Sequence, residues 1–538
     1  MSDFRTVGLM IDLSRNAVMS LDGWRRFLPI VSKMGYNAMF LYMEDTYEVE
    51  GEPYFGYMRG RYSIDEMKAL DALGTEYGIE MIPCIQTLGH LSTLSKWAAY
   101  PKDTEDILLV GDERVYTLID NMFSTLERCF KSRRIHIGMD EADQLGKGNY
   151  LSLHGYENQG DIMRKHLTRV TKIAEEHGYE LMMWSDMFFR GWNNSSYYAE
   201  AGSIIPDEYR NALPATVAPV YWDYYMKSEK RYDDMLDIHR QLSDKTAFAG
   251  GVWTWLGFTP DNLHSIQTML PAIRMCRKHG TKDVFFTLWG DDGGECSRFA
   301  VLAALYHIAE YIKGNEDEDK IKAGFEAEFG VSYDDFLLLD KPNYVGRFDS
   351  PWATNPSKYG IFSDCFQGFL DYVIAEGGNG EYADCAQRLY TAEQKAGDYS
   401  YLFKTQRLLC EILSHKYELG VKTRAAYKAG DKKELRHLAS EDYTAVINLL
   451  PDFYDAFRYQ WELENKTWGF EVQDLRLGGL LMRMKNQKRM LEEYLDGKRT
   501  SIPELECEIL QYRTREAGKS MYYNMHYRAI SSNVVRSN

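Results

Sequence analysis

Short apolar runs recur over about the first 315 residues, and most of them follow a segment with helical spacing. Helical stretches end at Gly35, Gly78, Gly178 and Gly280, and an apolar run follows each within a few residues. Glycine commonly closes a helix because it adopts the left-handed conformation without strain. Runs that are continuously apolar, rather than alternating, are typical of strands buried on both faces in a parallel sheet. The pattern therefore predicts alternating strands and helices.

Eight such runs precede residue 316, with helical segments between most of them. They lie at residues 7–11, 38–42, 80–85, 135–137, 180–184, 216–221, 247–255 and 283–289. Eight strand–helix units over about 300 residues are typical of a closed (β/α)8 TIM barrel, although an open doubly wound sheet could also hold eight strands. We therefore predict an α/β fold with a barrel domain over residues 1–315.

One helix between these strands has clear start and stop signals. We expect it to begin at Asp161, an N-cap residue type, and to end before Gly178. Residues expected to be buried recur between them at helical spacing, at Ile162, His166, Val170 and Ile173.

The strand–helix rhythm stops after about residue 315. Long helical patterns then dominate, at 402–417 and 477–495 for example, and predict an all-α helical domain over residues 316–538. The glycine-rich stretch 468–479 favours a connection between two helices. We also expect an ordered loop at 350–357 and a frayed tail at 531–538.

Composition narrows the possible partners. A formal net charge of -17 argues against nucleic acid or an anionic membrane surface. The chain has no apolar run of the roughly 20 residues that a bilayer crossing needs, and its first residues lack the pattern of a secretory signal. The eight cysteines form no Cys-x-x-Cys pair, which favours reduced thiols in a cytoplasm over disulfides or a zinc site.

Two adjacent carboxylates follow the fourth predicted strand. Asp140 and Glu141 come directly after Ile137-Gly-Met, at the strand end where an α/β protein keeps its chemistry. An isolated Asp-Glu at such a place more often caps the next helix. Neighbouring carboxylates repel when both ionise, so one tends to keep its proton, and an acid beside a base suits cleavage of a glycosidic bond.

Seven of the eight strands deliver an aromatic ring, a carboxylate, an arginine or a histidine to this face. Those outside the fourth strand are Asp12 and Arg15, His90, Trp184 and Asp186, Tyr221 and Asp223, Trp253 and Trp255, and Trp289 and Asp291. A single tryptophan at a strand end is often only a large core residue. Several around a carboxylate pair indicate a sugar pocket, because aromatic faces stack on a pyranose while polar side chains hold its hydroxyls.

These motifs, in this order, resemble glycoside hydrolase family 20, the β-N-acetylhexosaminidases. The resemblance covers residues 6 to 310, and its most specific segments are Asp12-x-Ser-Arg15, Gly89-His90, His136-Ile-Gly-Met-Asp-Glu141, Tyr221-x-Asp223 and Trp289-Gly-Asp291. The chain most resembles the bacterial branch that lacks the small N-terminal α/β domain and carries a C-terminal helical domain. The resemblance implies that residues 1–315 form a catalytic barrel.

The resemblance implies a substrate-assisted mechanism. The 2-acetamido oxygen of the sugar attacks the anomeric carbon, which gives an oxazolinium intermediate and net retention. Glu141 would act as acid and then base, Asp140 would orient the acetamido group, and Tyr221 would donate to its oxygen. The implied substrate-binding residues are Arg15, His90, Trp184, Asp223, Trp253, Trp255, Trp289 and Asp291.

Four residues depart from the family pattern. Met139 replaces a glycine, Gln86 replaces an aspartate common in the family, Leu88 replaces a proline, and Asp291 shortens a glutamate. The last change puts the contacts to O4 and O6 in doubt, and a looser grip on O4 would fit release of GalNAc as well as GlcNAc.

Alternatives remain open. Loss of turnover through Met139 and Gln86 would leave a non-catalytic N-acetylhexosamine-binding barrel. A two-carboxylate mechanism would need a second acid about 5–10 Å away, such as Asp186, Glu44 or Asp45. We expect no metal and no cofactor, because no His/Cys ligand cluster appears. Expected partners are N-acetylhexosamine-terminated oligosaccharides, and the helical domain could form a homodimer.

Overall fold

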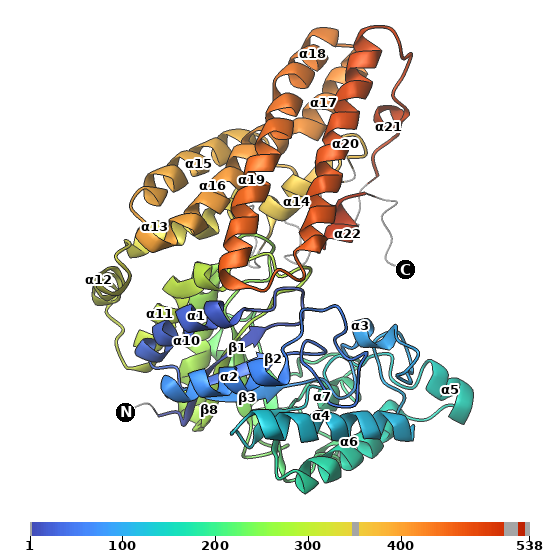
Figure 1. Ribbon diagram of the computed structural model, residues 1–538, viewed down its shortest axis with the longest axis vertical. Helices are drawn as coiled ribbons and strands as arrows, with labels where there is room; N and C mark the ends of the chain where they lie inside the picture. Colours follow the sequence, from blue (N-terminus) through green and yellow to red (C-terminus); the bar gives the residue numbers. More distant parts are fainter. Residues whose placement is uncertain (1–2, 347–353, 369, 511–525, 533–538) are drawn as a thin grey trace. The chain divides into compact units, whose positions relative to one another are not determined.

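The structure, a computed structural model, describes residues 3–346, 354–368, 370–510 and 526–532. Figure 1 traces the chain through two compact units. The first unit ends at residue 315 but leaves out two segments, and the second unit contains 253–264, 290–306 and the residues after 315. The domain boundary expected at 315/316 stays a prediction.

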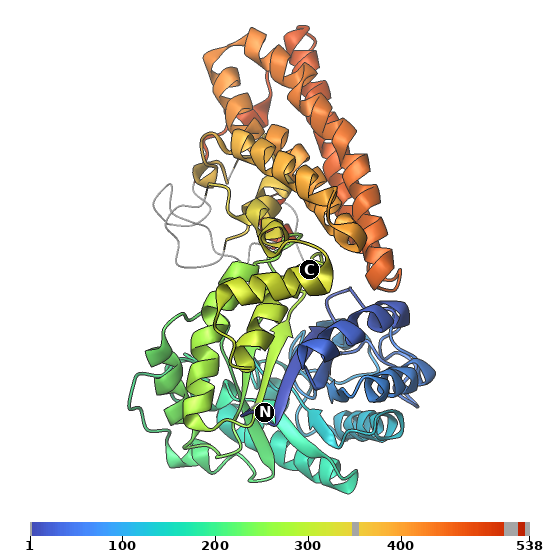
Figure 2. The same ribbon diagram turned by 90° about the vertical axis from the view of Figure 1, so that its left-hand side faces the viewer.

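Within the described residues, eight parallel strands close into a barrel in which each strand pairs with the next and β8 pairs with β1. The strands are β1 (Thr6–Asp12), β2 (Ala38–Tyr42), β3 (Glu80–Cys84), β4 (Arg134–His136), β5 (Glu180–Trp184), β6 (Val217–Trp222), β7 (Ala247–Gly251) and β8 (Asp283–Leu288). The closure confirms the predicted TIM barrel and excludes the open sheet. Figure 2 shows helices arranged around these strands.

The helices that alternate with the strands or follow β8 range from single turns to 18 residues. They are α1 (Leu21–Met34), α2 (Ile64–Glu76), α3 (Ser92–Ser95), α4 (Glu113–Cys129), α5 (Asn149–His154), α6 (Gln159–Glu176), α7 (Met187–Arg190), α8 (Asp207–Arg210), α9 (Glu229–His239), α10 (Asn262–His279), η1 (Arg298–Val301) and α11 (Leu302–Ile312). Local signals fix their ends. Gly35 closes α1 at a φ of 102°, and a capping box of Ser63 and Glu66 opens α2.

Side chains from alternate strand positions fill the barrel interior. Phe40 and Tyr42 of β2, Trp184 of β5 and Phe285 of β8 belong to this cluster and are all buried. Because successive side chains point to opposite faces of a strand, the intervening residues pack outward. This explains the runs that are apolar at most positions.

Two predicted boundaries in the first unit were wrong. α6 begins before Asp161, because Asn158 is the N-cap and its side chain accepts the N–H of Gly160. Asn caps a helix at least as well as Asp, so the earlier residue takes the role. β7 ends at Gly251 rather than at residue 255.

The second unit is helical, as predicted. Its elements are α12 (Glu318–Phe329), α13 (Tyr333–Phe336), η2 (Leu337–Asn343), α14 (Pro356–Phe362), η3 (Asp371–Val373), α15 (Gly378–Glu393), η4 (Gly397–Tyr399), α16 (Ser400–Lys416), α17 (Leu419–Ala429), α18 (Lys432–Ser440), α19 (Asp442–Glu464), α20 (Glu471–Leu495), α21 (Pro503–Glu506) and α22 (Tyr527–Ile530). α16 packs between α15 and α19 in its core.

The glycine-rich stretch 468–479 is not a connection throughout. α20 begins at Glu471 and runs through Gly478 and Gly479. Glycine weakens a helix by about 1 kcal/mol, but the buried residues Leu477 and Leu480 keep the helical spacing, so packing outweighs that loss.

Residues 350–353 of the predicted loop and 533–538 of the predicted tail lie outside the described residues. Among the residues described, no helix combines the length and the apolar character that crossing a bilayer would require.

Candidate active site

β4 ends in a turn that directs two adjacent carboxylates into different surroundings. Gly138, Met139 and Glu141 adopt left-handed backbone conformations, with φ of 72°, 69° and 50°. This conformation costs a residue with a side chain roughly 1–2 kcal/mol, so neighbouring groups must hold the turn. Gln86 is one of them, because its Oε1 accepts the backbone N–H of Met139 at 3.1 Å.

Asp140 is held as an anion. Gln86 Nε2 donates to its Oδ1 at 2.8 Å, and His90 Nε2 lies 3.1 Å from its Oδ2. Burial alone would raise the pKa of Asp140, but the facing His90 and the Gln86 hydrogen bond lower it to about 2. Burial likewise works against a charged His90, yet Asp140 raises the pKa of His90 to about 9. The two groups form an ion pair at neutral pH.

Glu141 has the opposite surroundings. Its backbone N–H donates to buried Asp186 Oδ2 at 2.9 Å, and Arg190 donates to its Oε1 at 3.2 Å. Burial and the negative charge of Asp140 raise the pKa of Glu141. The same two causes raise the pKa of Asp186 to about 7. Two adjacent carboxyl groups thus titrate in opposite directions, as an acid and an anion require.

Arg15 connects the loop after β1 to the carboxylate pair. Its guanidinium lies 3.5 Å from Glu44 Oε1, and it stands 5.1 Å above the Tyr42 ring and 5.4 Å from that of Trp289. Gln86 Nε2 donates to the Tyr42 hydroxyl at 3.0 Å as well as to Asp140. The predicted residues Arg15, His90 and Asp140 therefore belong to one network.

Aromatic rings line the same end of the barrel. Trp184 is buried with its ring 4.4 Å from that of His136, and Trp289 meets Tyr42 edge-on at 4.7 Å. Trp222, which sequence analysis did not single out, is only partly buried and packs against the interior cluster. Burial lowers the pKa of His136 to about 3, so His136 is a neutral core residue.

The structure does not bring Tyr221 to the carboxylate pair. Its hydroxyl donates to Asp223 Oδ2 at 3.0 Å, and its ring packs 4.6 Å from that of His239 on α9. Its neighbours Val220 and Trp222 belong to the barrel interior, so Tyr221 lies on the outward face of β6. Asp223 is also occupied: its Oδ1 accepts backbone N–H groups in the turn that follows.

A second tyrosine, Tyr224, lies two residues after the end of β6. Its ring stacks on Trp222 at 5.3 Å, which belongs to the interior cluster. Burial raises the pKa of Tyr224 well above its usual value, and the negative charge of Asp140 adds to the rise, while hydrogen bonds with Trp289 and Thr287 oppose it. Tyr224 therefore lies close enough to both Asp140 and Trp289 for them to shift its pKa.

Three predicted residues belong to the second compact unit. Trp253 and Trp255 follow β7 in the chain, and Asp291 follows β8. The two tryptophan rings stack on each other at 4.2 Å, and His264 meets Trp253 edge-on at 4.8 Å. Their predicted roles stay predictions.

One group of possible metal ligands occurs among the described residues: Asp233, Asp237 and His279. Asp233 already contacts His279 at 2.6 Å and Lys278 at 2.7 Å, and the Lys278 ammonium balances its charge. These residues lie on α9 and at the end of α10, on elements separate from the carboxylate pair.

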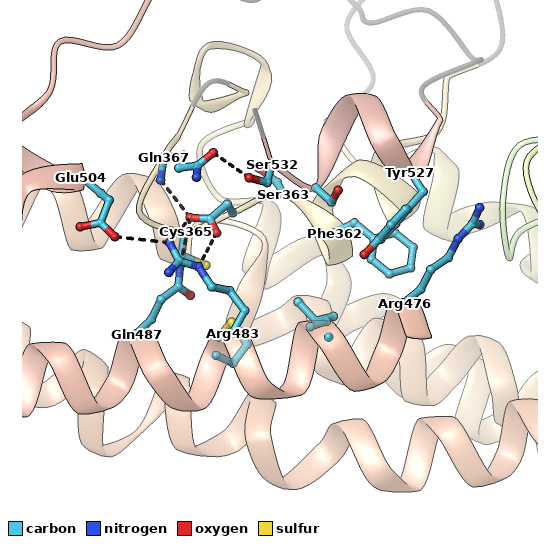
Figure 3. A pocket seen from close by; sticks show the side chains of 15 residues that line it. Phe362, Ser363, Cys365, Gln367, Arg476, Arg483, Gln487, Glu504, Tyr527 and Ser532 are labelled. Carbon is cyan, nitrogen blue, oxygen red and sulfur yellow. Dashed lines mark hydrogen bonds and ion pairs between the residues drawn. The ribbon is translucent and has the colours of Figure 1, made fainter. Parts of the chain in front are cut away.

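The helical unit has a cavity of about 360 Å³, shown in Figure 3. Both of its carboxylates face a cation: Arg483 Nε lies 2.7 Å from Asp364 and its Nη2 lies 3.8 Å from Glu504. Gln487 also donates to Asp364 at 3.0 Å. The cavity therefore offers no free acid–base pair.

Fold and site define the class of protein: a TIM barrel that gathers its titratable groups at the carboxyl ends of its strands. Two family models match the chain. "Glycosyl hydrolase family 20, catalytic domain" matches residues 4–209, and "Glycoside Hydrolase 20C C-terminal domain" matches residues 334–524. The chain belongs to glycoside hydrolase family 20.

Curated relatives cover only parts of the sequence. Hexosaminidase D from Homo sapiens is 26% identical over 217 residues, which are 36% of this chain and 40% of that protein. Hexosaminidase D from Bos taurus is 24% identical over 267 residues, 47% of this chain and 71% of that protein. The chain thus spans less than half the length of the human relative.

Solved structures are similar at low identity. The GH20 exo β-N-acetylglucosaminidase from Vibrio harveyi, in complex with N-acetylglucosamine, has a TM-score of 0.47 and 16% identity, covering 65% of this chain and 60% of that chain. The β-N-acetylhexosaminidase from Bacteroides fragilis has a TM-score of 0.44 and 18% identity, covering 61% and 70%.

Proposed function

We propose that the chain is a retaining exo-β-N-acetylhexosaminidase that releases terminal, non-reducing GlcNAc from oligosaccharides. The observation that supports this most is the contrast between the two carboxylates: Asp140 contacts His90 and Gln86, which lower its pKa, whereas Glu141 lies beside Asp140 and Asp186, and its pKa is raised. Family membership and the names of the relatives point the same way. A carboxyl group with a raised pKa beside a fixed anion suits a reaction in which the substrate supplies its own nucleophile.

In this proposal Glu141 protonates the leaving glycosidic oxygen. The acetamido oxygen attacks the anomeric carbon as that bond breaks, and the ring that forms carries a positive charge. Asp140 accepts the acetamido N–H and balances this charge. Water then attacks the anomeric carbon and gives its proton to Glu141, while the bond from the acetamido oxygen to that carbon breaks and the neutral amide is restored. Arg190, which donates to Glu141 Oε1, stabilises the ionised form between the two steps.

Tyr224 rather than Tyr221 donates to the acetamido oxygen. Its pKa responds to Asp140, whereas the Tyr221 hydroxyl is engaged by Asp223. Asp223 then acts indirectly, by shaping the turn that carries Tyr224.

Aromatic rings and charged groups surround the sugar in this proposal. Trp184, Trp222 and Trp289 form its walls, and Arg15 binds outer hydroxyls. GalNAc is a second substrate in this proposal, as the aspartate at position 291, where the family has a longer glutamate, suggests.

The alternatives receive less support. The binding-only reading depends on Met139 and Gln86, yet Gln86 donates to Asp140 and accepts from Met139. Gln86 thus helps to hold the anion, and the backbone N–H of Met139 holds Gln86 in turn. A two-carboxylate mechanism with Asp186 fits poorly, because Asp186 is buried and accepts the backbone N–H of Glu141.

Release of nitrophenol from the β-GlcNAc aryl glycoside tests the proposal. Glu141→Gln and Asp140→Asn should each lower kcat by about 10²–10⁴, while Asp161→Asn on the surface of α6 should behave as wild type. The β-GalNAc glycoside should also be cleaved, and the β-glucoside, which lacks the amide, should not. Equal rates on the β-glucoside, or equal rates for wild type and both carboxylate variants, would refute the mechanism.

A further inference from the structure

Three aromatic side chains gather on the loops that follow β2 and β3. Tyr54 and Tyr57 are 47% and 46% exposed, and Trp97 is partly exposed. The Tyr54 ring stacks on Trp97 at 5.4 Å, and Tyr57 meets Trp97 edge-on at 5.7 Å. We call these three residues the aromatic platform. Met58 beside it is 60% exposed.

The loop after β2 is anchored before Tyr54 and again between Tyr54 and Tyr57. Buried Glu52 forms an ion pair with Arg114 and accepts from Asn121 Nδ2 at 2.9 Å, so α4 holds the loop. Phe55 is fully buried and packs edge-on against Tyr47 at 5.0 Å. A loop fixed in this way loses little entropy when it binds a ligand.

Two residues of this loop have a restricted backbone conformation. Met58 is in the left-handed region at a φ of 59°, although its side chain gains little by burial. A Cβ at Gly56 would collide with the carbonyl of Asp45. The backbone around Gly56 and Met58 is therefore held in one conformation by its surroundings.

Hydrogen bonds connect the platform loops to the loops of the candidate active site. Asp45 accepts from Arg59 Nε at 3.1 Å and from Thr93 Oγ1 at 2.8 Å. Thr93 lies three residues after His90, and Arg59 also donates to the carbonyl of Ser14. The platform therefore stands on the same end of the barrel as Asp140, in a shared framework.

We propose that the aromatic platform binds pyranose rings on the reducing side of the cleaved bond, in oligosaccharides longer than two sugars. Exposed, rigid aromatic faces stack on the C–H surfaces of sugars. The site rests on the proposed function, since it extends the substrate from a terminal residue to a chain. Each lost ring should weaken binding of a chain by about threefold to tenfold.

Two substrates separate this role from the catalytic one. On the aryl β-GlcNAc glycoside, Trp97→Ala and the double variant Tyr54→Ala/Tyr57→Ala should match wild type. On a β-1,4-linked GlcNAc tetramer, both should lose about tenfold in kcat/KM, mainly through KM, and Trp97→Phe should recover most of it. Trp468→Ala is the control. It removes a tryptophan that is 44% exposed from the helical unit, and kcat/KM should be unchanged on both substrates.

Binding measurements keep the two proposals distinguishable. Calorimetry on Glu141→Gln should show that the tetramer binds. Adding Trp97→Ala to this variant should weaken tetramer binding and leave binding of the GlcNAc monosaccharide unchanged. If wild type cleaves no aryl glycoside yet Trp97→Ala still weakens tetramer binding, the proposed function fails and the platform stands. Equal losses on both substrates, or no loss on the tetramer, would overturn the platform. So would gel filtration in which Trp97→Ala abolishes a dimer without affecting glycan binding.

Discussion

The ion pair between His90 and Asp140 makes a pH-dependent prediction about stability. His90→Gln removes the cation that faces Asp140 but keeps a side chain that can donate a hydrogen bond. Because Asp140 is almost fully buried, with 14% of its side chain exposed, little water can replace the lost charge.

The size of this stabilisation follows from the pKa shift of His90 alone. A rise in the pKa of His90 from 6.5 to about 9 corresponds to about 3 kcal/mol of folding free energy. The lowered pKa of Asp140 describes the same ion pair and is not added. The folded-state pKa of His90 lies above the unfolded value, so this stabilisation is complete below pH 6.5 and is lost as the pH rises through 9.

Urea denaturation, followed by tryptophan fluorescence at pH 6 and pH 9.5, measures this contribution to the free energy of unfolding. Wild type should be about 3 kcal/mol more stable than His90→Gln at pH 6, and most of the difference should disappear at pH 9.5. Groups that titrate elsewhere cancel in this comparison. His154→Gln, an exposed change on α5, should show no such pH dependence. A difference between wild type and His90→Gln that stays constant with pH would refute the ion pair.

Two further substitutions test the frame around the site. Gly138→Ala places a Cβ against Gln86 Oε1 at a positive φ. It should displace this partner of Asp140 and lower kcat/KM more than tenfold. The control Gly202→Ala is also at a positive φ but has open space around it, so kcat/KM should be unchanged. Arg134→Met breaks contacts of 2.5 Å to Glu80 and 3.4 Å to Asp283 at the opposite end of the barrel. It should destabilise the protein by about 3 kcal/mol with an unchanged KM, and a changed KM would show that the two ends are coupled.

The barrel could be predicted from sequence because its strands are buried on both faces. Continuous apolar runs such as Ala38–Tyr42 leave little choice but a parallel sheet, and the glycines that precede them mark helix ends. Asp140 and Glu141 follow directly from this, since a residue just past a strand lies at its carboxyl end. Helix starts were harder to place, because Asn158 and Asp161 are both good caps.

Tyr221 shows the limit of a motif. The Tyr-x-Asp pattern selected it, but β6 continues to Trp222, and the face of a strand changes at every residue. Tyr224 lies beyond the end of β6, so strand alternation cannot place it, and only the turn after β6 brings its ring against Trp222. The role of Asp186 could not be predicted at all, because it depends on the turn after β4 bringing the N–H of Glu141 to within 2.9 Å of Asp186.

The strained turn explains why adjacent carboxylates differ. In an extended strand, neighbouring side chains point to opposite faces, and only one of them could reach the site. The left-handed residues Met139 and Glu141 change the direction of the chain twice within three residues. Asp140 thereby meets a cation and an amide donor, whereas Glu141 remains 46% exposed in its side chain and near a second acid. The turn thus gives the two carboxylates different neighbours, and those neighbours lower the pKa of Asp140 and raise that of Glu141.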